Sequence, residues 1–197
     1  MKLPGVLLAV LLLLAACATP VVTRYYTLEG AVPANVTAVP DVSEYHVVIG
    51  PVSVPEALDR RQLVLRVGPH RDLIADAERW SEPLKRQIPR VIAADVGRRL
   101  PQAGLAADAQ LGGQDADYRV WIDVLRFESQ PGLSVTFEAA WSIRNRGGAR
   151  LHEARSLFVL PVHAPGVAPL VAAQAQALAA FAGEIAEALR ALAPGKS

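Results

Sequence analysis

Three consecutive segments, two of them of alternating hydrophobicity, restrict the possible folds of this chain more than any other feature. They span residues 118–130, 133–145 and 150–162, and apolar side chains recur at every second position in the first two. A period of two is typical of β-strands that bury one face. Pro131-Gly132 and Gly147-Gly148 favour tight turns between the segments. The sequence therefore predicts three neighbouring strands in an antiparallel meander.

Four more strands and two helices are expected around this meander. The strand segments are rich in β-branched and aromatic residues and span residues 24–28, 45–54, 62–67 and 71–75. Apolar residues at helical spacing predict one helix over about residues 82–100, kinked at Pro89, and a second, Ala-rich helix over residues 167–192. We therefore predict an α+β fold, with a largely antiparallel sheet of about seven strands and both helices packed on one face.

One face of that sheet is expected to stay partly apolar and uncovered. In the strand over residues 118–130, alternation directs Trp121, Leu125 and Phe127 away from the face that the helices cover. A contiguous exposed apolar patch usually marks an interaction surface. Residues 29–43 and 106–117, which are small, polar or rich in Pro, are expected to be loops. Gly50-Pro51 indicates a bulge or an edge position in its strand.

The N-terminus has the pattern of a secretion signal that ends at the only cysteine of the chain. Lys2 precedes an apolar run over residues 6–16, which is too short to cross a bilayer. Leu14-Ala15-Ala16-Cys17 resembles the bacterial lipobox, in which the cysteine thiol receives diacylglycerol and becomes the new N-terminus. The resemblance implies fatty acyl chains, palmitate among them, on Cys17. A plain signal peptide with a chance cysteine, or a tail anchor, is the alternative.

This interpretation divides the chain into three parts. We expect a lipoprotein signal peptide over residues 1–16, a lipidated tether over residues 17–23 and a single domain over residues 24–197. Ala18 stands where an Asp usually means retention at the inner membrane, so the resemblance implies sorting to the outer membrane. Residues 18–23 can span only about 20 Å when fully extended. The domain should therefore work close to a membrane surface.

The sequence offers no recognisable catalytic or metal-binding motif. The four histidines lack the spacing of metal ligands, and His70-Arg71-Asp72 lacks the Asn and the glycine-rich loop that a kinase site needs. A net charge of +1 also gives no bulk attraction to nucleic acid. We therefore expect no catalytic residue, no metal, no cofactor and no nucleic-acid partner. A hydrolase would need a nucleophile that the sequence does not indicate.

A segment rich in basic residues is the remaining feature. Between Arg60 and Arg99 there are ten Lys or Arg residues and five Asp or Glu residues. This excess is explained either by a solvated helix face with local ion pairs or by a surface that meets anionic lipid or an acidic partner. Our candidate surface for a partner or for lipid comprises Arg60, Arg61, Lys85, Arg86, Arg90, Trp121 and Phe127.

Seven stretches together resemble a known family. They are Tyr25-Tyr26-Thr27-Leu28, Val48-Ile49-Gly50-Pro51-Val52-Ser53-Val54-Pro55, Leu58-Asp59-Arg60-Arg61-Gln62-Leu63-Val64, Arg79-Trp80-Ser81-Glu82-Pro83-Leu84, Gln87-Ile88-Pro89-Arg90-Val91, Asp123-Val124-Leu125-Arg126-Phe127-Glu128 and Glu138-Ala139-Ala140-Trp141. The chain resembles the PqiC-type (paraquat-inducible) membrane-integrity transporter subunits, also called ABC-type transport auxiliary lipoproteins, over about residues 24–190. It departs from them at Arg61, where the family tends to have Pro.

The resemblance implies a non-enzymatic outer-membrane lipoprotein that faces the periplasm and supports membrane integrity. Its implied partner is an MCE-domain (mammalian cell entry) protein that forms a tunnel for lipid from the inner membrane. Family members are thought to form a homo-oligomeric ring that receives the tip of that tunnel. The alternative is a periplasmic carrier lipoprotein that holds a lipid or another hydrophobic ligand between its helices and its sheet.

Overall fold

The computed structural model describes residues 22–29, 43–107 and 116–193. The predicted signal peptide, Cys17 and most of the predicted tether therefore lie outside the described residues. So do most of the two segments predicted to be loops. Within the described parts, no helix is long and apolar enough to cross a membrane.

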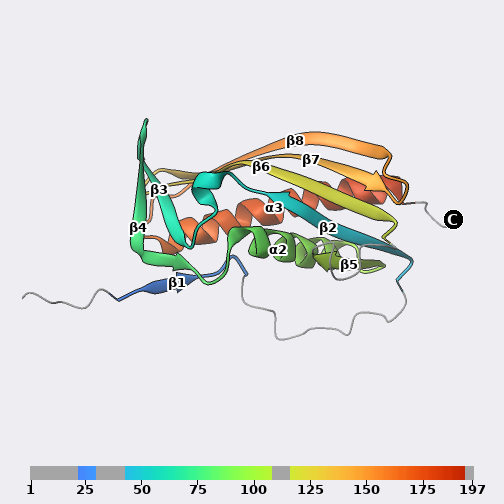
Figure 1. The fold of residues 1–197 in the computed structure, drawn as a ribbon, viewed down its shortest axis with the longest axis horizontal. Coiled ribbons are helices and arrows are strands. Elements are labelled where there is room, and N and C mark those ends of the chain that lie inside the picture. Colours follow the sequence, from blue (N-terminus) through green and yellow to red (C-terminus); the bar gives the residue numbers. More distant parts are fainter. Residues whose placement is uncertain (1–21, 30–42, 108–115, 194–197) are drawn as a thin grey trace, which may run out of the picture.

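The described residues form eight strands in two sheets (Figure 1). The larger sheet has the order β5 (Ala103–Ala107), β2 (Tyr45–Ser53), β6 (Tyr118–Gln130), β7 (Ser134–Asn145) and β8 (Arg150–Pro161). The smaller sheet has the order β1 (Arg24–Tyr26), β4 (Arg71–Trp80) and β3 (Gln62–Gly68). Strands β6, β7 and β8 pair antiparallel, which confirms the predicted meander, and β3 and β4 form the predicted hairpin.

The eighth strand is β5, which the sequence does not predict. It pairs in parallel with β2, on the side away from β6, which also runs parallel to β2. Its sequence, Ala-Gly-Leu-Ala-Ala, has no alternation and few β-favouring residues, so only its place beside β2 makes it a strand. A Cβ at Gly104 would lie 2.8 Å from Ser43 Oγ and 2.9 Å from His46 Cδ2, so glycine permits this close approach.

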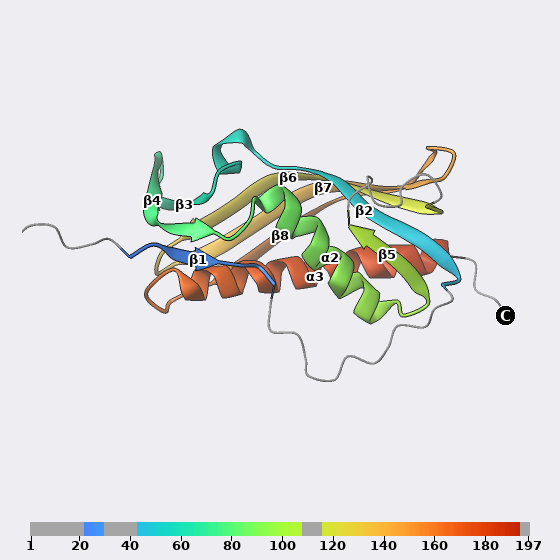
Figure 2. The same ribbon diagram turned by 60° about the horizontal axis from the view of Figure 1, so that its bottom comes forward.

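Both helices cover the same face of the five-stranded sheet, as predicted (Figure 2). Helix α2 (Leu84–Arg99) packs on β2 and β5, and helix α3 (Ala168–Leu192) packs on β7 and β8. The two helices also pack on each other. Pro89 lies inside α2 without dividing it, as the continuous apolar stripe predicts. The α+β class is thus confirmed, with eight described strands in place of about seven.

An aromatic cluster fills the core between the sheet and α3. Phe181 of α3 lies 5.1 Å from Phe137 of β7 and 5.7 Å from Trp141, measured between ring centroids. The indole Nε1–H of Trp141 donates a hydrogen bond of 2.9 Å to Ser156 Oγ, so its polar group is satisfied inside the core. These rings tie the centre of the sheet to the helix layer.

A β-bulge in β6 changes which side chains the open face exposes. The pairing of β6 with β7 shifts between Val124 and Arg126, because two residues of β6 stand opposite one residue of β7. The extra residue reverses the alternation beyond it. Trp121, before the bulge, is 40% exposed, whereas Phe127, after it, is 2% exposed and packs in the core. The prediction that Trp121 and Phe127 share the uncovered face is therefore wrong.

A second bulge lies where the sequence indicates one. The pairing of β2 with β6 shifts between Ile49 and Val52, around Gly50-Pro51. Gly50 has a φ of 131°, a conformation that L side chains rarely adopt. The pairing of β2 with β5 ends at Ile49, so from Gly50-Pro51 onward β6 is the only described strand beside β2.

The smaller sheet is fastened to the helix layer at the start of α2. Trp80, the last residue of β4, is buried, and its backbone N–H donates to the Arg61 carbonyl at 2.7 Å. The Gln87 side chain is fully buried in α2. Its Oε1 accepts from the Leu28 backbone N–H at 2.9 Å, and its Nε2 donates to the Glu82 carbonyl at 2.7 Å. This junction holds the chain that follows β1 against α2.

Candidate functional site: the open face of the five-stranded sheet

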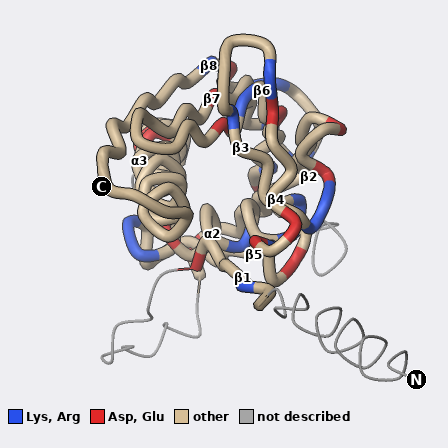
Figure 3. Tube along the Cα trace, turned by 90° about the vertical axis from the view of Figure 1, so that its left-hand side faces the viewer, with Lys and Arg blue, Asp and Glu red and all other residues tan. Residues whose placement is uncertain are grey.

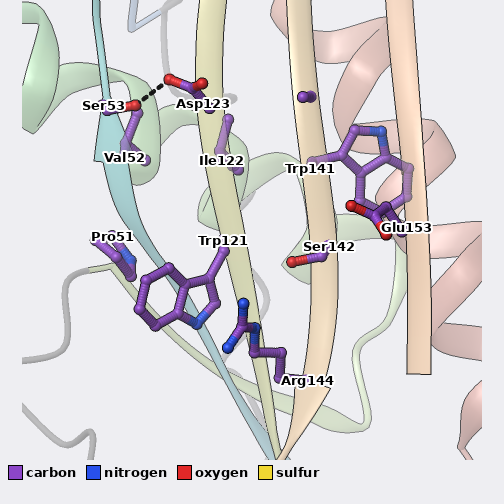
Figure 4. Close-up of a pocket in the computed structure, with 11 residues that line it drawn as sticks. Pro51, Val52, Ser53, Trp121, Ile122, Asp123, Trp141, Ser142, Arg144 and Glu153 are labelled. Atoms are coloured by element: carbon purple, nitrogen blue, oxygen red, sulfur yellow. Dashed lines mark hydrogen bonds between the residues drawn. The ribbon is translucent and has the colours of Figure 1, made fainter. Parts of the chain in front are cut away.

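The face of the five-stranded sheet that faces away from α2 and α3 carries the main surface feature, and we call it the open face. A shallow depression of about 400 Å³ crosses β2, β6, β7 and β8 on it (Figure 4). Its lining includes Pro51, Ser53, Trp121, Asp123, Ser142, Arg144 and Glu153. The depression thus combines one large aromatic ring with both signs of charge.

Trp121 and Arg144 form the centre of this depression. The Arg144 guanidinium carbon lies 4.7 Å from the centroid of the Trp121 ring, which is the geometry of a cation–π contact. Among the described residues, no carboxylate pairs with Arg144, whose Nε has no hydrogen-bond partner. Beside them, Ser53 Oγ donates a short hydrogen bond to Asp123. The pair therefore offers an aromatic surface next to an unneutralised cation.

A second group on the open face is an ion-pair cluster around Glu138 of β7. Arg126 of β6 and Arg155 of β8 both bind the Glu138 carboxylate, and the Arg155 Nε–Oε1 distance is 2.7 Å. Arg126 stands directly opposite Glu138 in the register of β6 with β7, whereas Arg155 stands opposite Ala140 on β7 and reaches Glu138 diagonally. Hydrogen bonds from Arg126, and then from Arg155, hold the pKa of this carboxyl below its ordinary value. The ionised carboxylate thus links three neighbouring strands.

We expect the Glu138→Gln variant to lose part of the acid sensitivity of the native fold. Because the folded-state pKa of Glu138 is lowered, its ionised form stabilises the fold above the ordinary pKa of 4.5. That stability is lost as the pH falls through the lower, folded-state pKa. Thermal unfolding measured across this acid range should therefore show a weaker pH dependence for Glu138→Gln than for the natural chain, and a lower Tm for the variant at neutral pH.

Glu153→Gln is the matched control on the same face. Among the described residues Glu153 forms an ion pair with Arg150 alone, and its side chain is 63% exposed. An exposed pair of this kind contributes little to stability. Equal pH profiles for Glu138→Gln and the natural chain would contradict the stabilising role of the cluster.

The predicted basic residues lie apart from the depression, whose lining includes none of them. Lys85 Nζ pairs with Asp59 at 2.5 Å, and Arg90 pairs with Glu29 and Glu82, each at 2.8 Å. These two residues therefore belong to local ion pairs. The Lys85–Asp59 pair also joins the loop before β3 to the first turn of α2.

Three basic residues of the candidate surface stay without an ion pair within the described parts of the chain. They are exposed and comprise Arg60, Arg61 and Arg86. Arg60 and Arg61 directly follow Asp59, and Arg86 directly follows Lys85, so the Asp59–Lys85 pair brings their segments together. Phe127, buried in the core, contributes to no surface. The candidate surface thus separates into Trp121 on the open face and a smaller basic group near the start of α2.

The open face offers groups that suit binding: an aromatic ring beside a cation, and an ion-pair cluster. No group of three or more His, Cys, Asp or Glu side chains within residues 22–29, 43–107 and 116–193 could hold a metal ion. Sequence reasoning identified Trp121 but missed Asp123, Glu138 and Arg144 as members of the site. The sequence does contain one signal for Glu138, because charged residues recur at outward positions of three neighbouring strands. Which of these residues lie close together depends on the strand register, and a single sequence does not give that register.

The comparisons with known proteins agree with this fold. Residues 26–186 match the family described as ABC-type transport auxiliary lipoprotein component, which confirms the resemblance found in the sequence. Among solved structures, a crystal structure of an uncharacterized protein has a TM-score of 0.71 and 20% identity, covering 85% of this chain and 99% of that chain. A Xanthomonas campestris protein of the family DUF330 has a TM-score of 0.64 and 20% identity, covering 83% of this chain and 93% of that chain. At this identity both show a common fold. No curated protein matches the sequence.

Proposed function

The chain belongs to the family of ABC-type transport auxiliary lipoprotein components, and we propose that it docks the tunnel of an MCE-type lipid transport system at the outer membrane. As a transport auxiliary lipoprotein it is a membrane-anchored partner of a transporter. In our proposal Cys17 carries the acyl chains, and residues 17–23 tether a non-enzymatic domain to the periplasmic side of the outer membrane. The observation that carries this proposal is the single cysteine, directly after Leu14-Ala15-Ala16, in a chain of this family.

The open face supports a docking role. Trp and Arg are enriched among the residues that dominate binding energy at protein interfaces, and Trp121 and Arg144 lie together on a face that no described helix covers. The unneutralised Arg144 would pair with an acidic group of the MCE-domain tunnel protein. We also propose a homo-oligomeric ring, since β5 and β8 leave two edges of the larger sheet without a described partner strand.

The alternative of a lipid carrier has less support. A ligand pocket for a small molecule usually measures about 300–1,000 Å³. The space beside Trp80, Leu84 and Gln174, between helices and strands, measures only about 10 Å³. A carrier would have to open this core to admit an acyl chain.

The docking proposal predicts that Arg144→Ala weakens capture of the tunnel protein. Loss of a central interface arginine typically costs about 2 kcal/mol or more, so we expect roughly a thirtyfold weaker affinity. The measurement is binding of the purified MCE-domain partner to the detergent-extracted full-length lipoprotein, with its mass measured under native conditions. Arg98→Ala is the control, because Arg98 lies on α2 and pairs with Asp95.

The same experiment separates the two functions. A docking subunit should be an oligomer that binds the partner, and Arg98→Ala should bind it as the natural chain does. A monomer that carries stoichiometric lipid and ignores the partner would overturn the docking proposal in favour of a carrier.

A further inference from the structure

Six of the ten large apolar side chains that are exposed within residues 22–29, 43–107 and 116–193 lie at one end of the domain; the other four lie on β6 and β8. The six lie on β1 and the residues before it, on the β3–β4 hairpin and in the turn between β6 and β7. We call this surface the apolar end, and it comprises Val22, Tyr25, Val67, Leu73, Ile74 and Leu133. The side chains are strongly exposed, with 51% of Leu73 and 58% of Leu133 open to solvent.

The strand pairing explains why these segments lie together. In Figure 1, the β3–β4 hairpin, the β6–β7 turn and the start of β1 all lie at the left of the molecule, and Figure 3 shows this end face on. Strand β1 pairs in parallel with β4, with Arg24 opposite Glu78. The chain before Arg24 therefore leaves the domain on the side where β4 begins, which is the side of the hairpin. The N-terminal segment and the apolar end thus belong to the same end of the domain.

The composition of this end matches the interface of a bilayer. Removing apolar surface from water stabilises by about 25 cal/mol per Å², so several exposed Leu, Ile and Val side chains favour an apolar environment. Tyr25 adds an amphipathic ring of the kind enriched at the headgroup level of membranes. Arg71, exposed at the start of β4, adds a cation that no described carboxylate pairs. An anionic headgroup could take that place.

We propose that the apolar end inserts its exposed side chains into the bilayer beside the acylated Cys17. The inference rests on the proposed function, because the anchor sets which end meets the membrane. Residues 18–23 allow a separation of only about 20 Å, so the apolar end is held at the surface at high local concentration. The acyl chains and the apolar end then form two separate membrane contacts. Two contacts fix the orientation of the domain, whereas the acyl chains alone would leave it free to rotate.

This orientation has a consequence for the docking face. Strand β7 begins next to the apolar end and runs twelve residues from Ser134 to Asn145, a length of about 40 Å. Arg144 and Trp121, which lies opposite Ser142, are therefore near the far end of the sheet. If the apolar end lies in the membrane, the Trp121–Arg144 depression faces away from the bilayer, toward a partner that crosses the periplasm.

The test places a fluorescent label at single positions of the full-length lipidated protein. The natural chain has one cysteine, which acylation consumes, so Leu73→Cys or Leu133→Cys supplies the only free thiol. Each variant carries an environment-sensitive dye in vesicles of phosphatidylethanolamine and phosphatidylglycerol with spin-labelled acyl chains. Leu151→Cys is the matched control, since Leu151 is 41% exposed and lies at the opposite end of the sheet.

We expect a blue shift and the loss of most fluorescence for the dye at residues 73 and 133, and neither change at residue 151. Dyes that stay in water at both positions of an acylated protein would overturn this inference and leave the docking proposal standing. A blue shift without quenching by the spin-labelled lipid would also overturn it, because a protein would then cover the apolar end. Intact mass without acyl chains would overturn the inference and the proposed anchor together.

Discussion

The Cys17→Ser variant should be lost completely from the outer-membrane fraction and accumulate as an unprocessed precursor or a soluble protein. A serine hydroxyl cannot replace the thiol that receives diacylglycerol, and the chain has no second cysteine to substitute for it. Each buried methylene contributes about 0.8 kcal/mol to membrane binding, and stable anchoring needs two signals. Without acyl chains, the apolar end of the domain would be the one remaining membrane contact, and a single contact does not anchor a protein stably. The measurement is fractionation of whole envelopes, followed by intact mass of the recovered chain.

Ala18→Asp is the companion variant, because it separates anchoring from sorting. An Asp directly after the lipidated cysteine usually means retention at the inner membrane in lipoproteins of this type. We therefore expect Ala18→Asp to be acylated and membrane-bound, but in the inner-membrane fraction.

Normal outer-membrane fractionation of Cys17→Ser would contradict the lipoprotein interpretation and the docking proposal that depends on it.

The parts of the fold that the sequence predicts well are those set by local chemistry. The meander of β6, β7 and β8 follows from a period of two and from two tight turns, and α2 and α3 follow from apolar stripes. Strand β5 could not be predicted, because Ala103–Ala107 has no intrinsic preference for a strand. The separation into two sheets could not be predicted either. It arises because β1 and β3 both pair with β4 and not with a strand of the larger sheet.

The candidate site shows the same division. Trp121 was predictable because alternation from Tyr118 places it outward, and it is exposed. Phe127 was placed on the wrong face, because a bulge between Val124 and Arg126 leaves no mark in a single sequence. The ion pairs of Arg90 with Glu29 and Glu82 could not be predicted from the sequence either. Residues 29 and 90 are distant in sequence, and only the packing of the segment after β1 against α2 brings them together.

Two of the stretches that carry the family resemblance have a structural role. Trp80 and Gln87 lie in these stretches, and both are buried where β1, β4 and α2 meet. The depression on the open face includes neither of them. These two motif residues therefore stabilise the packing of the smaller sheet on the helices. Variants that test partner binding should be made at other positions, on the open face.

Trp80→Ala is accordingly expected to lower the free energy of unfolding by about 3–5 kcal/mol. Trp80 is 3% exposed, and its ring packs in the region lined by Leu63, Leu84 and Phe127, between the smaller sheet, α2 and β6. Truncation of the side chain would leave a cavity where the two sheets meet. The strands on either side of this cavity are held by their pairing and cannot move together to close it. Chemical denaturation of the full-length protein, followed by circular dichroism, measures the loss.

Trp121→Ala provides a control with the same change of side chain in a different environment. Trp121 is 40% exposed, and its contact with Arg144 is worth about 0.5–1 kcal/mol at such a position. We therefore expect Trp121→Ala to unfold nearly as the natural chain does while losing affinity for the tunnel protein. Trp80→Ala should show the reverse pattern: reduced stability, with binding retained below its melting temperature. Equal stability of the two variants would mean that the junction contributes little to the fold, and the role of these motif residues would then have to be sought in partner binding.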